Sequence, residues 1–155
     1  MIGFRVSPAS VVLMAGLATA CAQGVAIAEM VVGTADSVQT LPLKRGFYVA
    51  TDTPCDQASN ATLLLVTSEG INSARTVCTF RTIDQTGRDT YRITEACFDI
   101  QGDELPDIRA TTYTLKGDEK FTVRSVHGWK SSARYCPQWS LPEPWRDNDI
   151  SDLID

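Results

Sequence analysis

The chain has 155 residues, 19 of them acidic and 14 basic, which gives a formal net charge of −5. An acidic body without a basic run argues against nucleic acid and anionic membrane surfaces as partners. Once an N-terminal targeting segment is set aside, the remaining length suits a single domain.

Residues 1–28 have the layout of a secretory signal peptide. Arg5 is the only charged residue among them, and the stretch VVLMAGLATACA at 11–22 is apolar or small. A positive charge, a short apolar run and small residues before the cut define such signals. Because a membrane-spanning helix needs about 20 apolar residues, the run predicts no transmembrane anchor.

Two cleavage sites fit the preference for small residues, after Ala22 and after Ala28. A third alternative is the tetrapeptide ATAC at 18–21, a degenerate bacterial lipoprotein box that would carry a lipid anchor on Cys21. The leucine that is usual three positions before this cysteine is missing, so plain cleavage is the preferred expectation. Either route removes Cys21 from disulfide chemistry and exports the protein, to the periplasm or beyond the cell.

The exported body keeps four cysteines, and an even number in a short exported chain predicts two disulfides. They are Cys55, Cys78, Cys97 and Cys136. Structural zinc sites use closely spaced pairs such as C-x2-C. The sequence contains no such pair, so we expect no metal site and no cofactor.

The rest of the chain predicts a flexible leader at 29–43, a β domain at 44–146 and an acidic tail at 147–155. The tail is the only helix candidate. Turns are expected at 84–88 and 116–119, where a glycine permits a positive φ. Short β-branched and alternating runs bounded by turn residues predict strands at 46–50, 62–67, 75–83, 89–100, 108–115 and 120–126.

Six short strands joined by short turns predict an all-β antiparallel meander that forms a small barrel or a two-layer sandwich. The up-and-down path also favours one of the three possible disulfide pairings. Cys78 and Cys97 fall at one end of adjacent strands, while Cys55 and the segment that leads to Cys136 reach the other end. We therefore expect the disulfides Cys78–Cys97 and Cys55–Cys136.

The single histidine, His127, is the residue that suggests a hydrolase. Serine-type catalysis would need a nucleophile beside it and an acid behind it, and the sequence has no G-x-S-x-G elbow. The run from Asp147 to Asp152 begins like a calcium loop but lacks the required glycine and glutamate. We expect neither a catalytic centre nor a calcium site.

The segment HGWKSSARYCPQWSLPEPW, residues 127–145, holds all three tryptophans. Its prolines remove backbone donors and favour an extended path outside the sheet ladder. One reading is that the tryptophans close the barrel end and hold the tail, with Trp129 as the best case. The other is an exposed patch for a partner, since tryptophan and arginine dominate binding hot spots. The predicted contacts are then Trp139, Trp145, Arg134 and Arg146.

Two stretches resemble motifs of the periplasmic inhibitors of c-type lysozyme, which are small disulfide-bonded β-barrels exported by bacteria. SSARY at 131–135 is similar to the family's S-G-x-x-Y motif, with Ser132 in place of glycine. YTLKGDE at 113–119 is similar to its Y-x-x-x-T-K-G-like motif, with Leu115 in place of threonine. The two stretches occur in reversed order along this chain.

The resemblance implies that Ser131, Tyr135 and Lys116 contact the acidic active site of an enzyme, where a lysine ammonium is attracted. More loosely, the whole chain resembles small exported proteins of Gram-negative bacteria, which implies its location.

Taken together, these patterns predict an exported binding or inhibitor module that contacts an exported or envelope protein through its aromatic C-terminal segment. The alternatives are a structural envelope protein without a ligand and a hydrolase that uses His127. An exposed Trp139 or Trp145 would favour binding, and three buried rings would favour a structural role.

Overall fold

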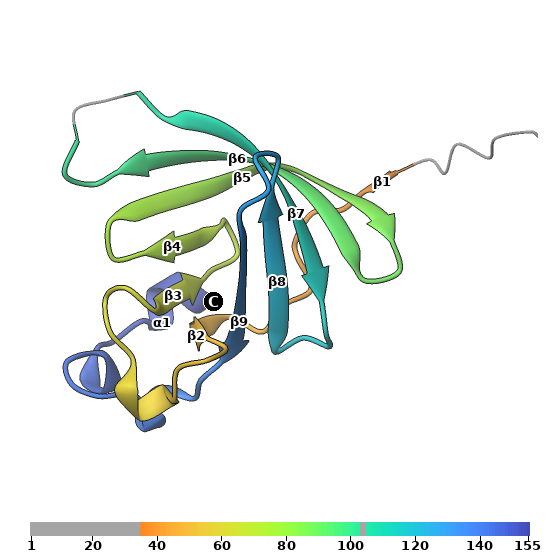
Figure 1. Ribbon diagram of the computed structural model, residues 1–155. Helices are drawn as coiled ribbons and strands as arrows, with labels where there is room; N and C mark the ends of the chain where they lie inside the picture. Colours follow the sequence, from red (N-terminus) through yellow and green to blue (C-terminus); the bar gives the residue numbers. More distant parts are fainter. Residues whose placement is uncertain (1–34, 103–104) are drawn as a thin grey trace, which may run out of the picture. The chain divides into compact units, whose positions relative to one another are not determined.

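The computed structural model describes residues 35–102 and 105–155 (Figure 1). The predicted signal peptide, its cleavage sites and Cys21 lie outside the described residues. In the described part, nine strands form one antiparallel sheet in the order β1-β5-β6-β7-β8-β9-β2-β3-β4. They are β1 (Asp36–Ser37), β2 (Gly46–Ala50), β3 (Leu63–Val66), β4 (Ile71–Ser73), β5 (Thr76–Gly87), β6 (Thr90–Asp99), β7 (Asp107–Leu115), β8 (Lys120–Ser125) and β9 (Lys130–Tyr135).

Helical structure in the described residues is confined to single turns. Three are 3-10 turns, η1 (Cys55–Gln57), η2 (Gln138–Ser140) and η3 (Trp145–Asp147), and one is the short α-helix α1 (Ser151–Ile154). The α-helix lies in the tail, where the sequence offered its only helix candidate. Within the described ranges, we find no helix with the length and apolar character needed to cross a membrane.

The all-β antiparallel class is confirmed, and the meander runs unbroken from β5 to β9. The sheet has three more strands than the six that we expected. Two of them, β1 and β4, span only two and three residues and carry no readable alternation. The third, β9, lies in the segment that we expected outside the sheet ladder; that expectation is wrong for 130–135, because the prolines come after this strand and its backbone pairs with β8 and β2. Leu41 and Leu43, which we expected in a flexible leader, are buried in the core. This part of the chain belongs to the folded body.

The β5–β6 hairpin turns later than predicted. Gly87 pairs with Thr90, so the turn consists of Arg88 and Asp89 instead of residues 84–88, and Gly87 does not have a positive φ. Two bulges in β5, which follow Phe80 and Gln85, explain the difference, because a bulged strand uses extra residues against its partner. In the β7–β8 turn, by contrast, Gly117 has the expected positive φ of 67°.

Both disulfides have the expected pairing, Cys78–Cys97 and Cys55–Cys136. The β5 bulges set Cys78 directly opposite Cys97 across the β5–β6 ladder. The Cys55–Cys136 bond joins the 3-10 turn η1 to the residue after β9. Two disulfides in one small domain fit an oxidising compartment.

The sheet curls so that its two ends meet, with β4 beside β5 (Figure 1). The amide of Phe80 donates to the carbonyl of Glu69 at 2.7 Å, and the amide of Cys78 donates to Oδ1 of Asn72 at 3.1 Å. Gly70 makes this approach possible, since a Cβ placed there would lie 1.7 Å from the carbonyl oxygen of Cys78.

Curling encloses one apolar cluster on the inner face of the sheet. Aromatic and β-branched side chains dominate it, as expected for strand residues that pack on a pleated surface. Its buried members are Leu41, Leu43, Tyr48, Val66, Ile71, Ile83, Tyr91, Ile93, Tyr113, Leu115, Phe121, Val123 and Ala133.

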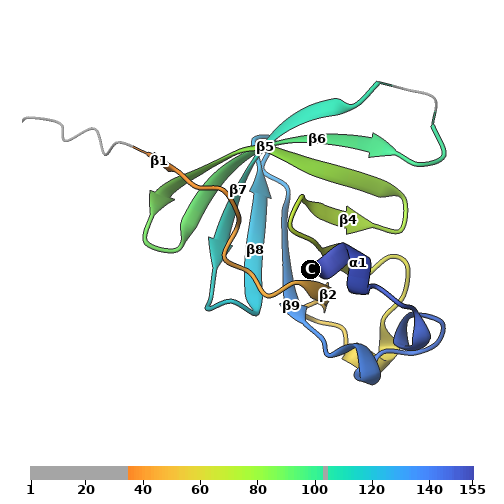
Figure 2. The same cartoon turned by 180° about the vertical axis from the view of Figure 1, so that it is seen from behind.

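A second cluster covers the outer face of β2 and β3, where the C-terminal segment packs (Figure 2). Phe47 and Val49 point outward from β2 into this cluster, while Tyr48 points inward. A strand buried on both faces has a continuous apolar run instead of alternation, which explains the sequence GFYVA. The C-terminal segment contributes Cys136, Leu141 and Ile150, so the predicted acidic tail is anchored by a buried isoleucine.

Candidate functional site

The three tryptophans of the C-terminal segment have different surroundings. Trp145 is half-buried and packs against the outer cluster. Trp139, in η2, is 78% exposed, and Trp129, in the β8–β9 turn, is 61% exposed. Trp129, our best candidate for burial, is therefore a surface residue, whereas Trp145 helps to hold the tail.

The two predicted contact arginines are engaged within the chain. Arg134 donates to Sγ of Cys55 at 2.9 Å and to the carbonyl of Thr53 at 2.8 Å, which fixes the loop around the disulfide. Arg146 is exposed and pairs with the carboxylates of Glu143 and Asp147.

The residues that the lysozyme-inhibitor resemblance implied do not gather at one place. Ser131 pairs with Val123, close to the β8–β9 turn, whereas Lys116 lies in the β7–β8 turn at the other end of β8. Tyr135 packs edge-on against Tyr48, with 5.7 Å between ring centroids, and Nζ of Lys44 lies 4.0 Å from its ring. Tyr135 thus serves the inner core.

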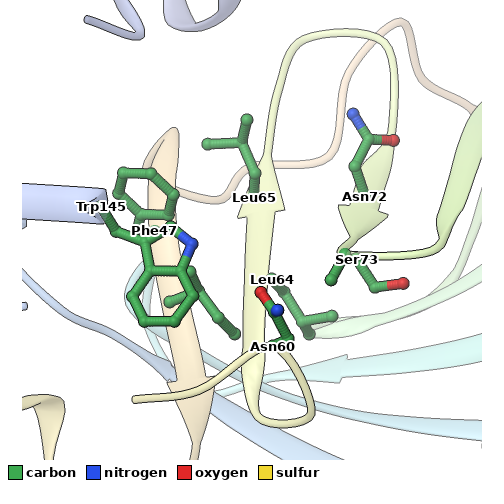
Figure 3. A pocket seen from close by; sticks show the side chains of 9 residues that line it. Phe47, Asn60, Leu64, Leu65, Asn72, Ser73 and Trp145 are labelled. Carbon is green, nitrogen blue, oxygen red and sulfur yellow. The ribbon is translucent and has the colours of Figure 1, made fainter. Parts of the chain in front are cut away.

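A groove of about 280 Å³ runs between β3, β4 and the tail (Figure 3). Trp145 and Phe47 form its aromatic side, and Asn72 and Ser73 form its polar side. Both polar residues already bond to the backbone of β5: Oδ1 of Asn72 accepts from Cys78, and Oγ of Ser73 accepts from the amide of Thr76 at 3.1 Å. We therefore interpret the groove as a packing boundary between elements of the fold instead of a ligand site.

A second surface of interest lies away from this groove. It is the end of the sheet where β6 and β8 finish and β7 and β9 begin, at the top of Figure 1. Three adjoining hollows, of about 240, 360 and 880 Å³, share Arg109 in their lining. Large apolar side chains stand exposed around them. We call five of these the apolar rim: Phe98, Ile100, Ile108, Val126 and Trp129.

Behind the rim, the smallest hollow enters the inside of the curled sheet. A polar row crosses it, with Glu95 on β6, Thr111 on β7 and Ser125 on β8. Oγ1 of Thr111 donates to Oε1 of Glu95 at 3.2 Å. Oγ of Ser125 is buried and has no hydrogen-bond partner within the described part of the chain. Glu95 itself is only 5% exposed.

Burial raises the pKa of Glu95 above its usual range, because a carboxylate loses hydration inside the sheet. The hydrogen bond from Thr111 and the positive charge of Arg109 act in the opposite direction. Nε of Arg109 donates to Asp107 at 2.8 Å, and its side chain is half-exposed. Burial, together with the charge of Glu95, also raises the pKa of Tyr113, the next inward residue on β7.

Other chemical candidates find no support among the described residues. His127 is exposed in the β8–β9 turn, and within the described residues no hydrogen bond joins it to a serine or a carboxylate. The atoms of Cys78, Glu95 and Cys97 lie within 4.8 Å of one another, but both sulfurs are in a disulfide and cannot act as thiolate ligands. In the calcium-like run, Asp149 accepts bonds from the amide and hydroxyl of Ser151.

The sequence analysis singled out the segment that contains Trp129 but not the polar row. A signal for Glu95 was available, since it shares the inward parity of Tyr91, Ile93 and Cys97 along β6. A charged residue in an otherwise apolar inward row is unusual and indicates a special environment. Ser125 and Thr111 gave no such signal.

In comparisons with protein-family models, with curated proteins and with solved structures, no match to this chain was found. The functional argument therefore depends on the geometry of the site itself.

Proposed function

We propose that this protein is an exported binding module that recognises a protein partner through the apolar rim. One observation supports this above the others. Of the eight large hydrophobic residues that are exposed in the described part of the chain, six lie at this end of the sheet: the five rim residues and Leu105. Scattered exposed hydrophobics are ordinary, but a concentrated group marks an interaction surface.

The chemistry around the rim favours a protein over a lipid surface. Two ion pairs lie at the same end of the sheet, Arg75 with Asp99 at 3.0 Å and Arg109 with Asp107 at 2.8 Å. Charged pairs at the edge of an apolar centre are typical of protein interfaces, whereas insertion into hydrocarbon would desolvate them at high cost. The net negative charge of the chain further disfavours anionic membranes.

Export is supported by the signal-like N-terminus and by the two disulfides, which persist in oxidising compartments. Within the predicted aromatic segment, Trp129 replaces Trp139 and Trp145 as the proposed contact tryptophan. Lysozyme inhibition is the less favoured form of binding, because Ser131 and Lys116 lie at opposite ends of β8. A structural envelope role leaves the exposed rim unexplained.

The test is a selection from a displayed random-peptide library on the purified, oxidised protein. We expect enriched peptides that bind the wild type and are lost with Trp129→Ser or Val126→Ser. Trp139→Ser is the matched control, since it removes an equally exposed tryptophan outside the rim. Peptides that bind all variants equally, or no enrichment at all, would contradict the proposal.

A second arm examines the lipid alternative with vesicles of phosphatidylethanolamine and phosphatidylglycerol in a flotation assay. We expect the wild type to stay unbound. Flotation that requires Trp129 would make the rim a membrane contact and overturn the protein-partner proposal.

A further inference from the structure

We infer that the hollow behind the apolar rim receives one basic side chain of the partner, lysine or arginine, whose cationic head pairs with Glu95. This inference rests on the proposed function and adds the chemistry of the residue that the partner must supply. It follows from the size of the hollow, from its hydrogen-bonding groups and from its charge.

The size of the hollow suits a single side chain. Its volume is about 240 Å³, below the roughly 300–1,000 Å³ that pockets for whole small molecules occupy. The rest of its lining is largely apolar, with residues from β3, β4 and β8. Such a wall suits the methylene stem of a long basic side chain, which packs on apolar surface while its head reaches polar groups. The wall residues are Leu64, Ile71, Phe121 and Val123.

The polar row is richer in acceptors than in donors, because the ionised Glu95 carboxylate only accepts and the Ser125 hydroxyl can accept as well as donate. The Thr111 hydroxyl already donates its proton to Oε1 of Glu95. Oγ of Ser125, buried in the lining of the same hollow, has no partner in the described chain. An ammonium brings three donors and a guanidinium five, and neither brings an acceptor. A basic head therefore complements this row better than a carboxylate or a carbonyl would.

The charges that face Glu95 also favour a cation. From β7, Arg109 faces it and Tyr113 lies beside it, and from β5 and β6 the neighbour is the neutral Cys78–Cys97 disulfide. Arg109 is held by Asp107 through its Nε, and in the described structure no hydrogen bond joins it to Glu95. The two carboxylates exceed the one guanidinium, so the local charge is negative when Glu95 is ionised.

Trp129 at the mouth of the hollow adds a second attraction. Its ring lines both the inner hollow and the neighbouring one of about 360 Å³. Tryptophan is the best aromatic partner for a passing cation. A basic side chain that enters between the rim residues would therefore meet Trp129 before it reaches Glu95.

The same peptide selection tests the inference. We expect the Trp129-dependent peptides to share a lysine or arginine flanked by apolar residues. Replacing the shared lysine by acetyl-lysine, or a shared arginine by citrulline, should weaken binding to the wild type at least tenfold. On Glu95→Gln, after circular dichroism has confirmed its fold, the charged and neutral peptides should bind within about twofold of each other.

A measurement on the wild-type protein tests the same inference without the Glu95→Gln variant. Carbon-13 NMR of labelled glutamate follows the titration of Glu95, and saturating lysine peptide should lower its pKa, because a cation favours the carboxylate. Trp129-dependent peptides without a basic residue, or an unchanged titration, would overturn this inference and leave the proposed function standing. If no peptide depends on Trp129, the proposed function itself fails.

Discussion

Glu95 occupies an inward position on β6 between Ile93 and Cys97, which are almost fully buried. The hydrogen bond from the Thr111 hydroxyl offsets part of the lost hydration, and Tyr113 acts in the same direction. A carboxylate retained at such a position destabilises the fold relative to a neutral group of the same shape. At this residue, the protein keeps a buried charge that packing alone does not require.

The pH dependence of stability tests this view of Glu95. Because burial raises its pKa from an ordinary value of 4.5, the folded protein binds that proton more tightly than the unfolded chain does. The destabilisation is then fully present above the raised pKa and disappears as the pH falls below 4.5. We expect Glu95→Gln to be more stable than the wild type at pH 8 and equal to it near pH 4.

Chemical denaturation at several pH values between these limits provides the measurement. Glu69→Gln is the matched control, since Glu69 is exposed and its side chain makes no hydrogen bond within the described residues. A stability difference for Glu95→Gln that stays constant with pH would contradict the account.

The tryptophans allow a second comparison at this scale. Trp145 packs on the outer cluster, and truncation of a half-buried tryptophan costs about 2 kcal/mol, somewhat less than in a full core. Trp139 is exposed, so Trp139→Ala should change the free energy of unfolding by no more than about 0.5 kcal/mol. Guanidinium denaturation of both variants checks this, and an equal cost for the two would show that Trp145 does not hold the tail.

At the scale of elements, the two disulfides hold different parts of the chain. Cys78–Cys97 links adjacent strands across 19 residues, while Cys55–Cys136 joins η1 to the C-terminal segment across 81 residues. Each bond has one almost fully buried cysteine, Cys97 or Cys136, and one half-buried partner. Removal of either pair therefore leaves similar cavities, and the loop length becomes the main difference.

We expect Cys55→Ala with Cys136→Ala to cost about 4.5 kcal/mol, and Cys78→Ala with Cys97→Ala about 3.2 kcal/mol, on the chain-entropy model of loop closure. Denaturation of the two double variants against the oxidised wild type measures the difference. A larger loss from the short loop would show that local packing around β5 and β6 outweighs loop entropy.

Local sequence patterns predicted most elements, because β5 to β8 form sequential hairpins with readable runs. The two-residue β1 and the three-residue β4 were not predictable, since their pairing with distant strands holds them in place. The β5 bulges likewise moved the turn away from residues 84–88. For the candidate site, the parity that Glu95 shares with Tyr91, Ile93 and Cys97 could have indicated an inward side chain. The hollow itself depends on the β7–β8 register that sets Thr111 opposite Ser125, which strand patterns do not fix.

At the scale of the whole molecule, the inner hollow exists because the curled sheet brings β4 against β5. Leu64 and Ile71 from one end of the sheet and Cys78 and Glu95 from the other end line the same space. The contact between β4 and β5 depends on the close approach of Gly70 to Cys78. If that contact opened, the hollow would lose one wall.

Gly70→Ala should therefore destabilise the protein by about 3 kcal/mol or more, because the new methyl group would overlap a backbone carbonyl that cannot rotate away. Gly87→Ala is the control: its nearest contact would be a side-chain atom at 3.5 Å, and its φ is not positive. Thermal unfolding of both variants distinguishes them, and a Gly70→Ala protein as stable as the wild type would refute the proposed closure.

The most direct test of the binding surface is the dissociation constant of one selected peptide, measured by isothermal titration calorimetry on three folded proteins. For Trp129→Ser we expect at least a tenfold weaker Kd than for the wild type, or about 1.4 kcal/mol, with the free energy of unfolding unchanged within about 0.5 kcal/mol. For Trp139→Ser we expect the wild-type Kd. The opposite result, in which binding survives the loss of Trp129 and fails without Trp139, would move the binding surface from the open end of the sheet to the C-terminal segment.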